Sequence, residues 1–162
     1  MRIPIAFLLM LPLAGFAQST TAQSKIAQSK DEKEVLAAVQ MLFDGMAAHS
    51  AEKLMAATSA NAQFVSSTAG QLRVITREAF VKSNENNKAA ALERIWEPKV
   101  RIQGTIADVW AEYDYHRDGK FDHCGIDAFQ LVKEGAVWKI VSVIWTSEKE
   151  NCKPSPLGPP KS

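Results

Sequence analysis

The sequence holds few of the residues on which several specialised protein classes depend. Only two of its 162 residues are cysteine, which is too few for a disulfide scaffold or a cysteine-rich metal site. Lys and Arg total 19 against 18 Asp and Glu, so the chain lacks the basic excess of nucleic-acid-binding proteins. A mean hydropathy of −0.14 excludes a polytopic membrane protein. These absences leave a globular chain of ordinary composition, long enough for one domain.

Common signatures of catalytic and cofactor sites are also missing. The three histidines are scattered, with no H-x-H or H-x-x-x-H spacing of the kind that zinc sites use. There is no G-x-S-x-G nucleophile elbow and no phosphate-binding glycine loop. We therefore expect no metal, no organic cofactor and no nucleic-acid partner.

The first residues have the pattern of a targeting segment. Arg2 precedes an apolar run over residues 3–13, and Gly15 and Ala17 supply small residues before a cleavage point. This predicts a signal peptide over residues 1–17. An uncleaved anchor is the alternative, but the run is shorter than the roughly 20 residues of a membrane-spanning helix. We expect an exported protein, periplasmic or secreted, with no membrane contact after cleavage.

Composition divides the remaining chain into three parts. Residues 18–29 are mostly Gln, Ser, Thr and Ala, which predicts a disordered leader. Residues 153–162 contain four prolines and a glycine, which predicts a disordered Pro-rich tail. The folded domain is then expected at residues 30–152.

Hydrophobic periodicity and turn signals give the order of elements within this domain. Helical spacing predicts helices at residues 30–49, 50–57 and 77–84. Strand-like segments lie at residues 62–66, 71–75, 92–103, 106–116, 121–132 and 137–147. This order predicts an α+β domain, α-α-β-β-α-β-β-β-β, with the helices on one face of a mostly antiparallel sheet.

Two short segments carry a resemblance to a known superfamily. Residues 135–140, leading into Trp145 and Thr146, are similar to the G-x-W-x-I ending of nuclear transport factor 2-like proteins. Residues 117–120 and 123–127 resemble its lumazine-binding-like and SnoaL-like branch. The resemblance implies a cone-shaped roll, in which a curved sheet wraps around helices and encloses a pocket. The superfamily contains isomerases, dehydratases, cyclases and non-catalytic binding or association domains, so membership does not decide the activity.

The expected hairpins predict which side chains share the pocket face. Two-residue turns at Asp118-Gly119 and Glu134-Gly135 would set Asp114 opposite His123. The same face would have an apolar end, formed by Phe129, Leu131, Trp138 and Ile140. Its polar end would line the pocket with Trp110, Glu112, Asp114, His123, Asp127 and Ser142.

Three of these polar residues are candidates for catalysis. A carboxylate beside an imidazole suits general acid–base chemistry, which makes His123 with Asp114 a candidate pair. Asp127 is a candidate general base. The alternative is structural, because cross-strand His–Asp pairs also arise from charge complementarity, and Asp127 could bond Ser142 and the Trp110 indole.

The opposite face is expected to be too apolar to face water in a monomer. Its predicted members are Val109, Ala111, Tyr113, Cys124, Ile126, Ala128, Val141, Val143 and Trp145. The resembled fold commonly pairs two subunits through this convex face, which implies a homodimer. Burial under the chain's own tail is the alternative. Cys124 and Cys152 are expected to form a disulfide, with two free thiols as the alternative.

Two functions remain open at this point. The first is an exported module that binds a small apolar or amphipathic molecule, or serves association. The second is a cofactor-independent isomerase, dehydratase or cyclase that uses His–Asp acid–base chemistry. An open cavity with His123, Asp114 and Asp127 pointing inward would favour the enzyme.

Overall fold

The computed structural model of the protein describes residues 28–160. The predicted signal peptide and residues 18–27 of the predicted leader lie outside the described residues. Within residues 28–160, no helix is both long enough and apolar enough to cross a membrane.

Three helices begin where their capping residues predict. They are α1 (Lys30–Ala47), α2 (Ala51–Ala57) and α3 (Arg77–Asn86). Ser29, Ser50 and Thr76 each accept a hydrogen bond from a backbone N–H in the first turn that follows. The first helix ends two residues earlier than predicted, and His49 just beyond it has a positive φ of 51°.

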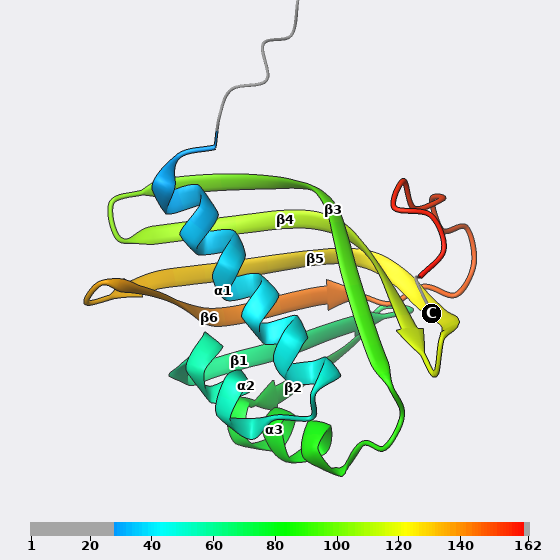
Figure 1. The fold of residues 1–162 in the computed structure, drawn as a ribbon. Helices are drawn as coiled ribbons and strands as arrows, with labels where there is room; N and C mark the ends of the chain where they lie inside the picture. Colours follow the sequence, from blue (N-terminus) through cyan, green and yellow to red (C-terminus); the bar gives the residue numbers. More distant parts are fainter. Residues whose placement is uncertain (1–27, 161–162) are drawn as a thin grey trace, which may run out of the picture.

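Six strands form one curved sheet around these helices (Figure 1). They are β1 (Thr58–Thr68), β2 (Gln71–Thr76), β3 (Ala91–Gln103), β4 (Ile106–Arg117), β5 (Lys120–Glu134) and β6 (Val137–Thr146). The strand order is β2-β1-β6-β5-β4-β3, and only the β1–β6 pair is parallel. The predicted α+β roll is confirmed.

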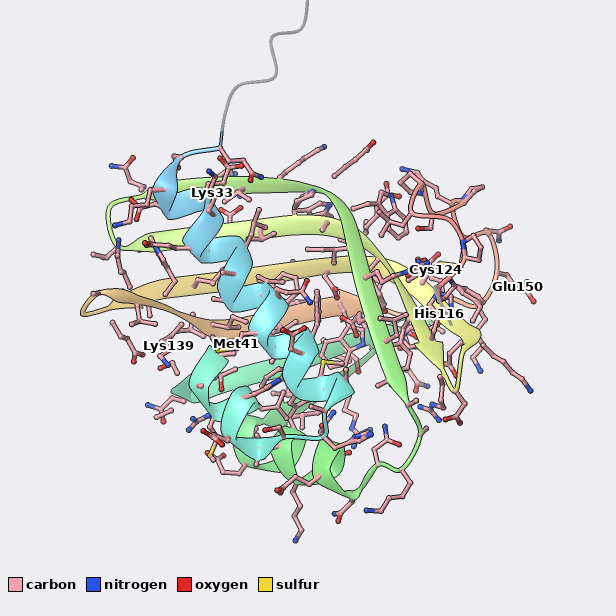
Figure 2. The ribbon with its side chains drawn as sticks, viewed as in Figure 1. Lys33, Met41, His116, Cys124, Lys139 and Glu150 are labelled. Atoms are coloured by element: carbon pink, nitrogen blue, oxygen red, sulfur yellow. A yellow bond between two sulfur atoms is a disulfide. The ribbon has the colours of Figure 1, made fainter. Side chains whose placement is uncertain are left out.

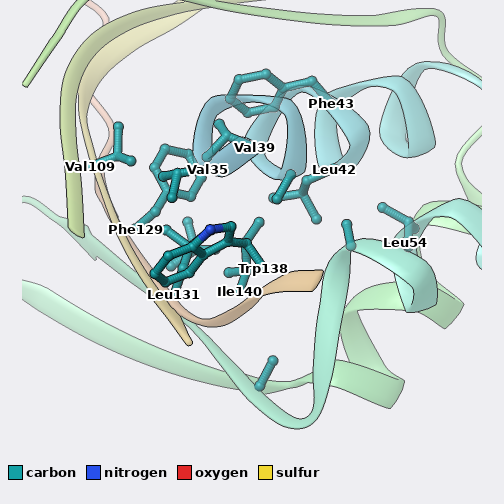
Figure 3. Packing of buried hydrophobic residues seen from close by; sticks show 14 of the residues in the cluster. Val35, Val39, Leu42, Phe43, Leu54, Val109, Phe129, Leu131, Trp138 and Ile140 are labelled. Carbon is teal, nitrogen blue, oxygen red and sulfur yellow. The ribbon is translucent and has the colours of Figure 1, made fainter. Parts of the chain in front are cut away.

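The core fills one part of this cone. Side chains from α1 pack against the inner face of β4, β5 and β6 (Figure 3). Phe43 meets Phe129 edge to face, with ring centroids 5.9 Å apart. Leu131, Trp138 and Ile140 are at most 2% exposed in the same cluster. The apolar end of the predicted pocket face is therefore a filled core, and the largest cavity found among the described residues lies toward the C-terminal end of α1.

A bulge in β5 changes the register expected for the first hairpin. The turn is at Asp118-Gly119, as predicted, with Arg117 opposite Lys120. The register then shifts at Asp122, so that His123 pairs with Tyr115. Asp114 pairs with Cys124, and the predicted Asp114–His123 pair is wrong.

A second bulge changes the last hairpin. Its turn is at Gly135-Ala136, one residue later than predicted, because Glu134 pairs with Val137. The register shifts again between the Leu131–Ile140 and Gln130–Ser142 pairs. Ser142 is thereby placed on the outer face, because strand side chains alternate and Val143 belongs to the core.

These two shifts reverse the faces predicted for most of β4 and the end of β6. Trp110 is 53% exposed on the outer face, whereas Tyr113 is 1% exposed on the inner face. The other residues moved to the inner face are Val109, Ala111, Val143 and Trp145. Of the predicted convex set, Cys124, Ile126 and Ala128 lie on the outer face, because β5 has the expected orientation.

The C-terminal segment lies against the outer face near the β4–β5 hairpin (Figure 2). A disulfide joins Cys124 to Cys152, as predicted. Lys153 forms an ion pair with Glu112, and Arg94 donates to the Gly158 carbonyl oxygen at 3.0 Å. Residues 153–160 contain no helix or strand, but these contacts place them on β3 and β4.

Candidate functional site

A cavity of about 650 Å³ lies between the end of α1, helix α3 and the inner face of the sheet. Its volume is in the usual range of small-molecule sites. Its apolar lining is Leu42, Met46, Phe64, Ile75, Ala79, Phe80, Val143 and Trp145. Its polar lining is Arg73, Ser83, Asn84, Asn86, Asn87, Glu93, Tyr113, Tyr115, Arg117, His123 and Asp127.

Two carboxyl groups meet inside this cavity. Asp127 on β5 is 2% exposed, and the Glu93 side chain on β3 lies within hydrogen-bonding reach of it. Burial raises the pKa of Asp127 well above its usual value, and the charge of Glu93 raises it further. Burial also raises the pKa of Glu93 to about 7. The pair therefore holds a proton near neutral pH, which relieves the repulsion between the two groups.

The pair has no positive partner in the described chain. No Lys, Arg or His of residues 28–160 forms a salt bridge with Glu93 or Asp127. Asp127 Oδ2 is buried and has no hydrogen-bond donor within the same residues. Buried polar atoms without partners are uncommon in proteins, and each calls for an explanation such as a bound water, a bound ion or a functional role.

His123 lines the cavity and is oriented by its sequence neighbour. Its Nδ1 lies 2.7 Å from Asp122 Oδ1, and this hydrogen bond lowers the pKa of Asp122. Its ring packs against Tyr113 and Tyr115, with centroids 5.6 and 4.9 Å away. A His–Asp pair is therefore present, but its carboxylate is that of Asp122 rather than Asp114.

The predicted convergence of His123, Asp114 and Asp127 is not found. His123 and Asp127 are four residues apart on β5, which is about 13 Å along a strand. Asp114 lies on the outer face, where its Oδ2 is 2.6 Å from Arg94 Nη2 and its Oδ1 is 3.4 Å from His116 Nε2. Each group therefore has different surroundings.

Of the six predicted pocket residues, the structure places His123 and Asp127 in the cavity. Trp110, Glu112, Asp114 and Ser142 lie on the outer face of the sheet instead. Glu93 was missed, because nothing in the sequence of β3 marks its contact with a residue two strands away. The curvature of the sheet brings the two carboxyl groups together.

Gly125 allows β6 to pack closely against β5 beside Tyr113 in the wall of the cavity. Tyr113 pairs with Gly125, and its hydroxyl reaches past β5 to donate to the Thr146 carbonyl oxygen at 2.6 Å. A Cβ at position 125 would lie 2.3 Å from that oxygen and 2.6 Å from Thr146 Oγ1. Glycine is therefore required here for close approach of β6.

Replacing Gly125 with Ala is expected to lower the free energy of unfolding by about 2 kcal/mol, because the new methyl group forces β6 away from β5. Urea denaturation measures the change. Gly119→Ala is the matched control, since position 119 has a positive φ of 73° but open space around it. A smaller loss at position 125 than at position 119 would contradict the steric argument.

The chain matches a family over most of its described length. The family described as "Putative lumazine-binding" matches residues 30–146, and the chain belongs to it. The expected membership of the nuclear transport factor 2-like superfamily is confirmed. No match was found among curated proteins.

Solved structures share the fold at low sequence identity. An NTF2-like protein of Cytophaga hutchinsonii is 14% identical with a TM-score of 0.64, covering 75% of this chain and 100% of that one. An NTF-2-like protein of unknown function from Silicibacter pomeroyi is 20% identical with a TM-score of 0.58, at 75% and 100% coverage. A Streptomyces avermitilis protein described as "a putative dehydratase from the NTF2-like family" is 14% identical with a TM-score of 0.58, at 73% and 96% coverage.

Proposed function

We propose that the protein binds a small apolar or amphipathic molecule in the cavity, with Asp127 anchoring the polar group of the ligand. The observation that carries the proposal is that Asp127 lines the cavity while its buried Oδ2 has no hydrogen-bond partner among the described residues. The apolar walls supply burial, and a few convergent polar groups fix orientation, which is the usual design of such sites. Membership of the lumazine-binding family supports the same conclusion.

Native mass spectrometry of protein purified from its own host tests this proposal. A retained small molecule is expected on the unmodified chain. Ala79→Trp places a large side chain into the cavity from α3 and is expected to abolish the retained mass. Lys82→Trp is the control, because Lys82 is exposed on the same helix and does not line the cavity. Equal retention by both variants would place the ligand elsewhere.

A second candidate function is acid–base catalysis of an isomerase, dehydratase or cyclase type. It is favoured by Glu93, whose pKa of about 7 suits proton transfer at neutral pH. The Asp122–His123 pair is a second acid–base group in the same cavity. The relative described as a dehydratase agrees with this candidate in fold alone.

Hydrogen exchange into the retained molecule distinguishes the two functions. After incubation in D2O, an enzyme that abstracts a C–H proton labels its ligand with deuterium, whereas a binding module leaves those positions unlabelled. The double variant Glu93→Gln, Asp127→Asn is expected to prevent labelling, and Glu112→Gln on the outer face serves as the control. Labelling that persists in the double variant would exclude the pair as the base.

We also propose that the outer face forms a homodimer. The register places Trp110, Ala128 and Ile144 side by side across β4, β5 and β6. Trp110 and Ile144 are 53% and 43% exposed, which is unusual for such residues in one patch. The hydrogen bond, the ion pair and the disulfide of the tail involve Arg94, Glu112 and Cys124, and Trp110 and Ile144 stay exposed with the tail in place. A second copy of the chain is the proposed partner.

Ile144→Glu is expected to convert the dimer to a monomer, because it introduces a charge at the centre of the apolar row. Sedimentation equilibrium measures the association. Met55→Glu is the control, since Met55 is equally exposed but lies on α2, on the helical side of the molecule. A dimer of unchanged affinity in the Ile144 variant would rule out this interface.

Export to the periplasm or the cell exterior remains part of the proposal. The targeting pattern of residues 1–17 and the Cys124–Cys152 disulfide both support it, because disulfides persist in oxidising compartments. The intact mass of protein from its own host tests it, since cleavage after Ala17 leaves a chain that begins at Gln18. A mass that includes residues 1–17 would contradict export by this signal.

A further inference from the structure

We propose that the ligand carries a protonated amine, and that Glu93 and Asp127 together bind this cation while the aromatic walls hold an apolar body. This inference rests on the proposed function and specifies the chemical class of the ligand. It assigns to the carboxyl pair the role of an ammonium site.

The missing positive charge is the first argument. The chain contains another buried carboxylate, Asp114, and there the guanidinium of Arg94 makes two hydrogen bonds of 2.6 and 2.8 Å. Asp127 is more buried than Asp114, yet no cationic side chain of residues 28–160 pairs with it. An ionised carboxylate in such a place is costly unless a counter-charge arrives. A ligand cation supplies the charge that the described chain does not.

The walls around the pair are the second argument. Tyr113 and Trp145 line the cavity on the sheet side. Phe64 and Phe80 stack with centroids 3.8 Å apart and line it on the α3 side. Aromatic faces attract ammonium groups and also bury hydrocarbon. The combination suits an amine attached to an apolar or aromatic body.

Other ligand charges fit less well. Arg73 and Arg117 also line the cavity, but both are exposed, so they lie toward its solvent side. An anion at Asp127 would meet two carboxyl groups at close range. A metal ion is also disfavoured, because no group of three or more His, Cys, Asp or Glu that could hold one occurs within residues 28–160. An ammonium group needs only two or three acceptor oxygens.

Proton release is a consequence of this assignment. A cation between the two carboxyl groups favours their ionised forms, so binding expels the proton that the pair holds. The charged and titratable groups that face or act on the pair are Arg73, Tyr113, Asp114, Tyr115, Arg117 and His123. Because Glu93, whose pKa is about 7, must lose its proton while the amine keeps its own, affinity is expected to rise with pH below about pH 7, by up to about tenfold per pH unit for each proton released.

Three matched probes test the inference: 4-phenylbutylamine, 4-phenylbutanol and 4-phenylbutyrate. Isothermal titration calorimetry is performed at pH 6 and pH 8, in two buffers of different ionisation enthalpy. The amine is expected to bind at least tenfold more tightly than the alcohol at pH 8, with proton release. Glu93→Gln and Asp127→Asn are each expected to lose this preference, whereas Glu112→Gln on the outer face keeps it. Circular dichroism confirms that each variant is folded.

The outcomes separate this inference from the proposed function. If the alcohol or the carboxylate binds as tightly as the amine, the ammonium site is overturned while the cavity remains a ligand site. If the amine fails to bind, the inference is also overturned. The retained mass in the Ala79→Trp experiment then decides independently whether the cavity binds any ligand.

Discussion

Removal of the Cys124–Cys152 disulfide is expected to lower the free energy of unfolding by about 3.5 kcal/mol. The bridge joins residues separated by 28 positions, and in the chain-entropy model a loop of this length gives a stabilisation of that size. Its closure restricts the unfolded chain, while in the folded protein it holds the C-terminal segment on the sheet. Guanidinium denaturation of the double variant Cys124→Ser, Cys152→Ser, compared with the oxidised protein, measures the loss.

The disulfide lies next to a backbone pairing between β5 and the segment that follows β6. Cys124 and Glu148 exchange two backbone hydrogen bonds of 2.9 Å, four residues before Cys152. Without the bridge, we expect faster amide exchange at Glu148 and weaker contacts of Lys153 and Gly158. The reduced natural sequence is the control and should match the double variant. A loss below about 1 kcal/mol in both would mean that the unfolded chain gains little freedom when the bridge is removed.

The helices and strands could be predicted because their signals are local. Capping residues such as Ser29 and Thr76 act within one turn, so the sequence alone marks where α1 and α3 begin. The Asp118-Gly119 turn is likewise a property of two adjacent residues. These local signals suffice for the element order, and the element order together with the resemblance of residues 135–140 to the superfamily's ending suffices for the superfamily.

The faces of β4 and of the end of β6 could not be predicted, because they depend on two single-residue bulges. Both faces of β4 carry large aromatic residues that tolerate burial, with Tyr113 and Tyr115 on one face and Trp110 on the other. The charged Asp114 does not mark the water-facing side, because Arg94 neutralises it at 5% exposure. One extra residue at Asp122 therefore reverses β4 with no contradiction in the sequence pattern.

The inward-facing side chains of β5 could be predicted, for a physical reason. Phe129 and Leu131 on one side contrast with the exposed Gln130 between them, so this strand has one interpretation. His123 and Asp127 share the parity of Phe129, and both line the cavity. Glu93 could not be added from sequence, because its contact with Asp127 arises from curvature across three strands and leaves no periodic signal.

The carboxyl pair is expected to make the protein less stable as the pH rises. Glu93 ionises near pH 4.5 in the unfolded chain and near pH 7 in the folded protein. Because the pKa of Glu93 is raised in the folded state, the free-energy cost of ionising it is absent below about pH 4.5, grows between pH 4.5 and pH 7, and is complete above about pH 7. The interval corresponds to a loss of about 3 kcal/mol for Glu93. Urea denaturation at pH 5 and pH 8 measures it.

Two carboxylates with lowered pKa values stabilise the folded protein in a different pH range. Burial opposes ionisation of Asp114, but its hydrogen bonds with Arg94 prevail, so its pKa lies below the usual 3.8. The pKa of Asp122 is also lowered, by its hydrogen bond to His123. Their stabilisation is present above pH 3.8 and is lost only as the pH falls through their lower folded values. The window between pH 5 and pH 8 therefore reports mainly on the pair.

The double variant Glu93→Gln, Asp127→Asn isolates this effect, because every other titratable group is kept. Its stability should change little between pH 5 and pH 8, and at pH 8 it should exceed that of the natural sequence, since no carboxylate must then be ionised in the cavity. Glu112→Gln, whose carboxylate is on the outer face, should keep the full pH dependence. If the double variant retained the slope of the natural protein, the two carboxyl groups would not be a buried pair, and the anchor on which ligand binding depends would be lost with it.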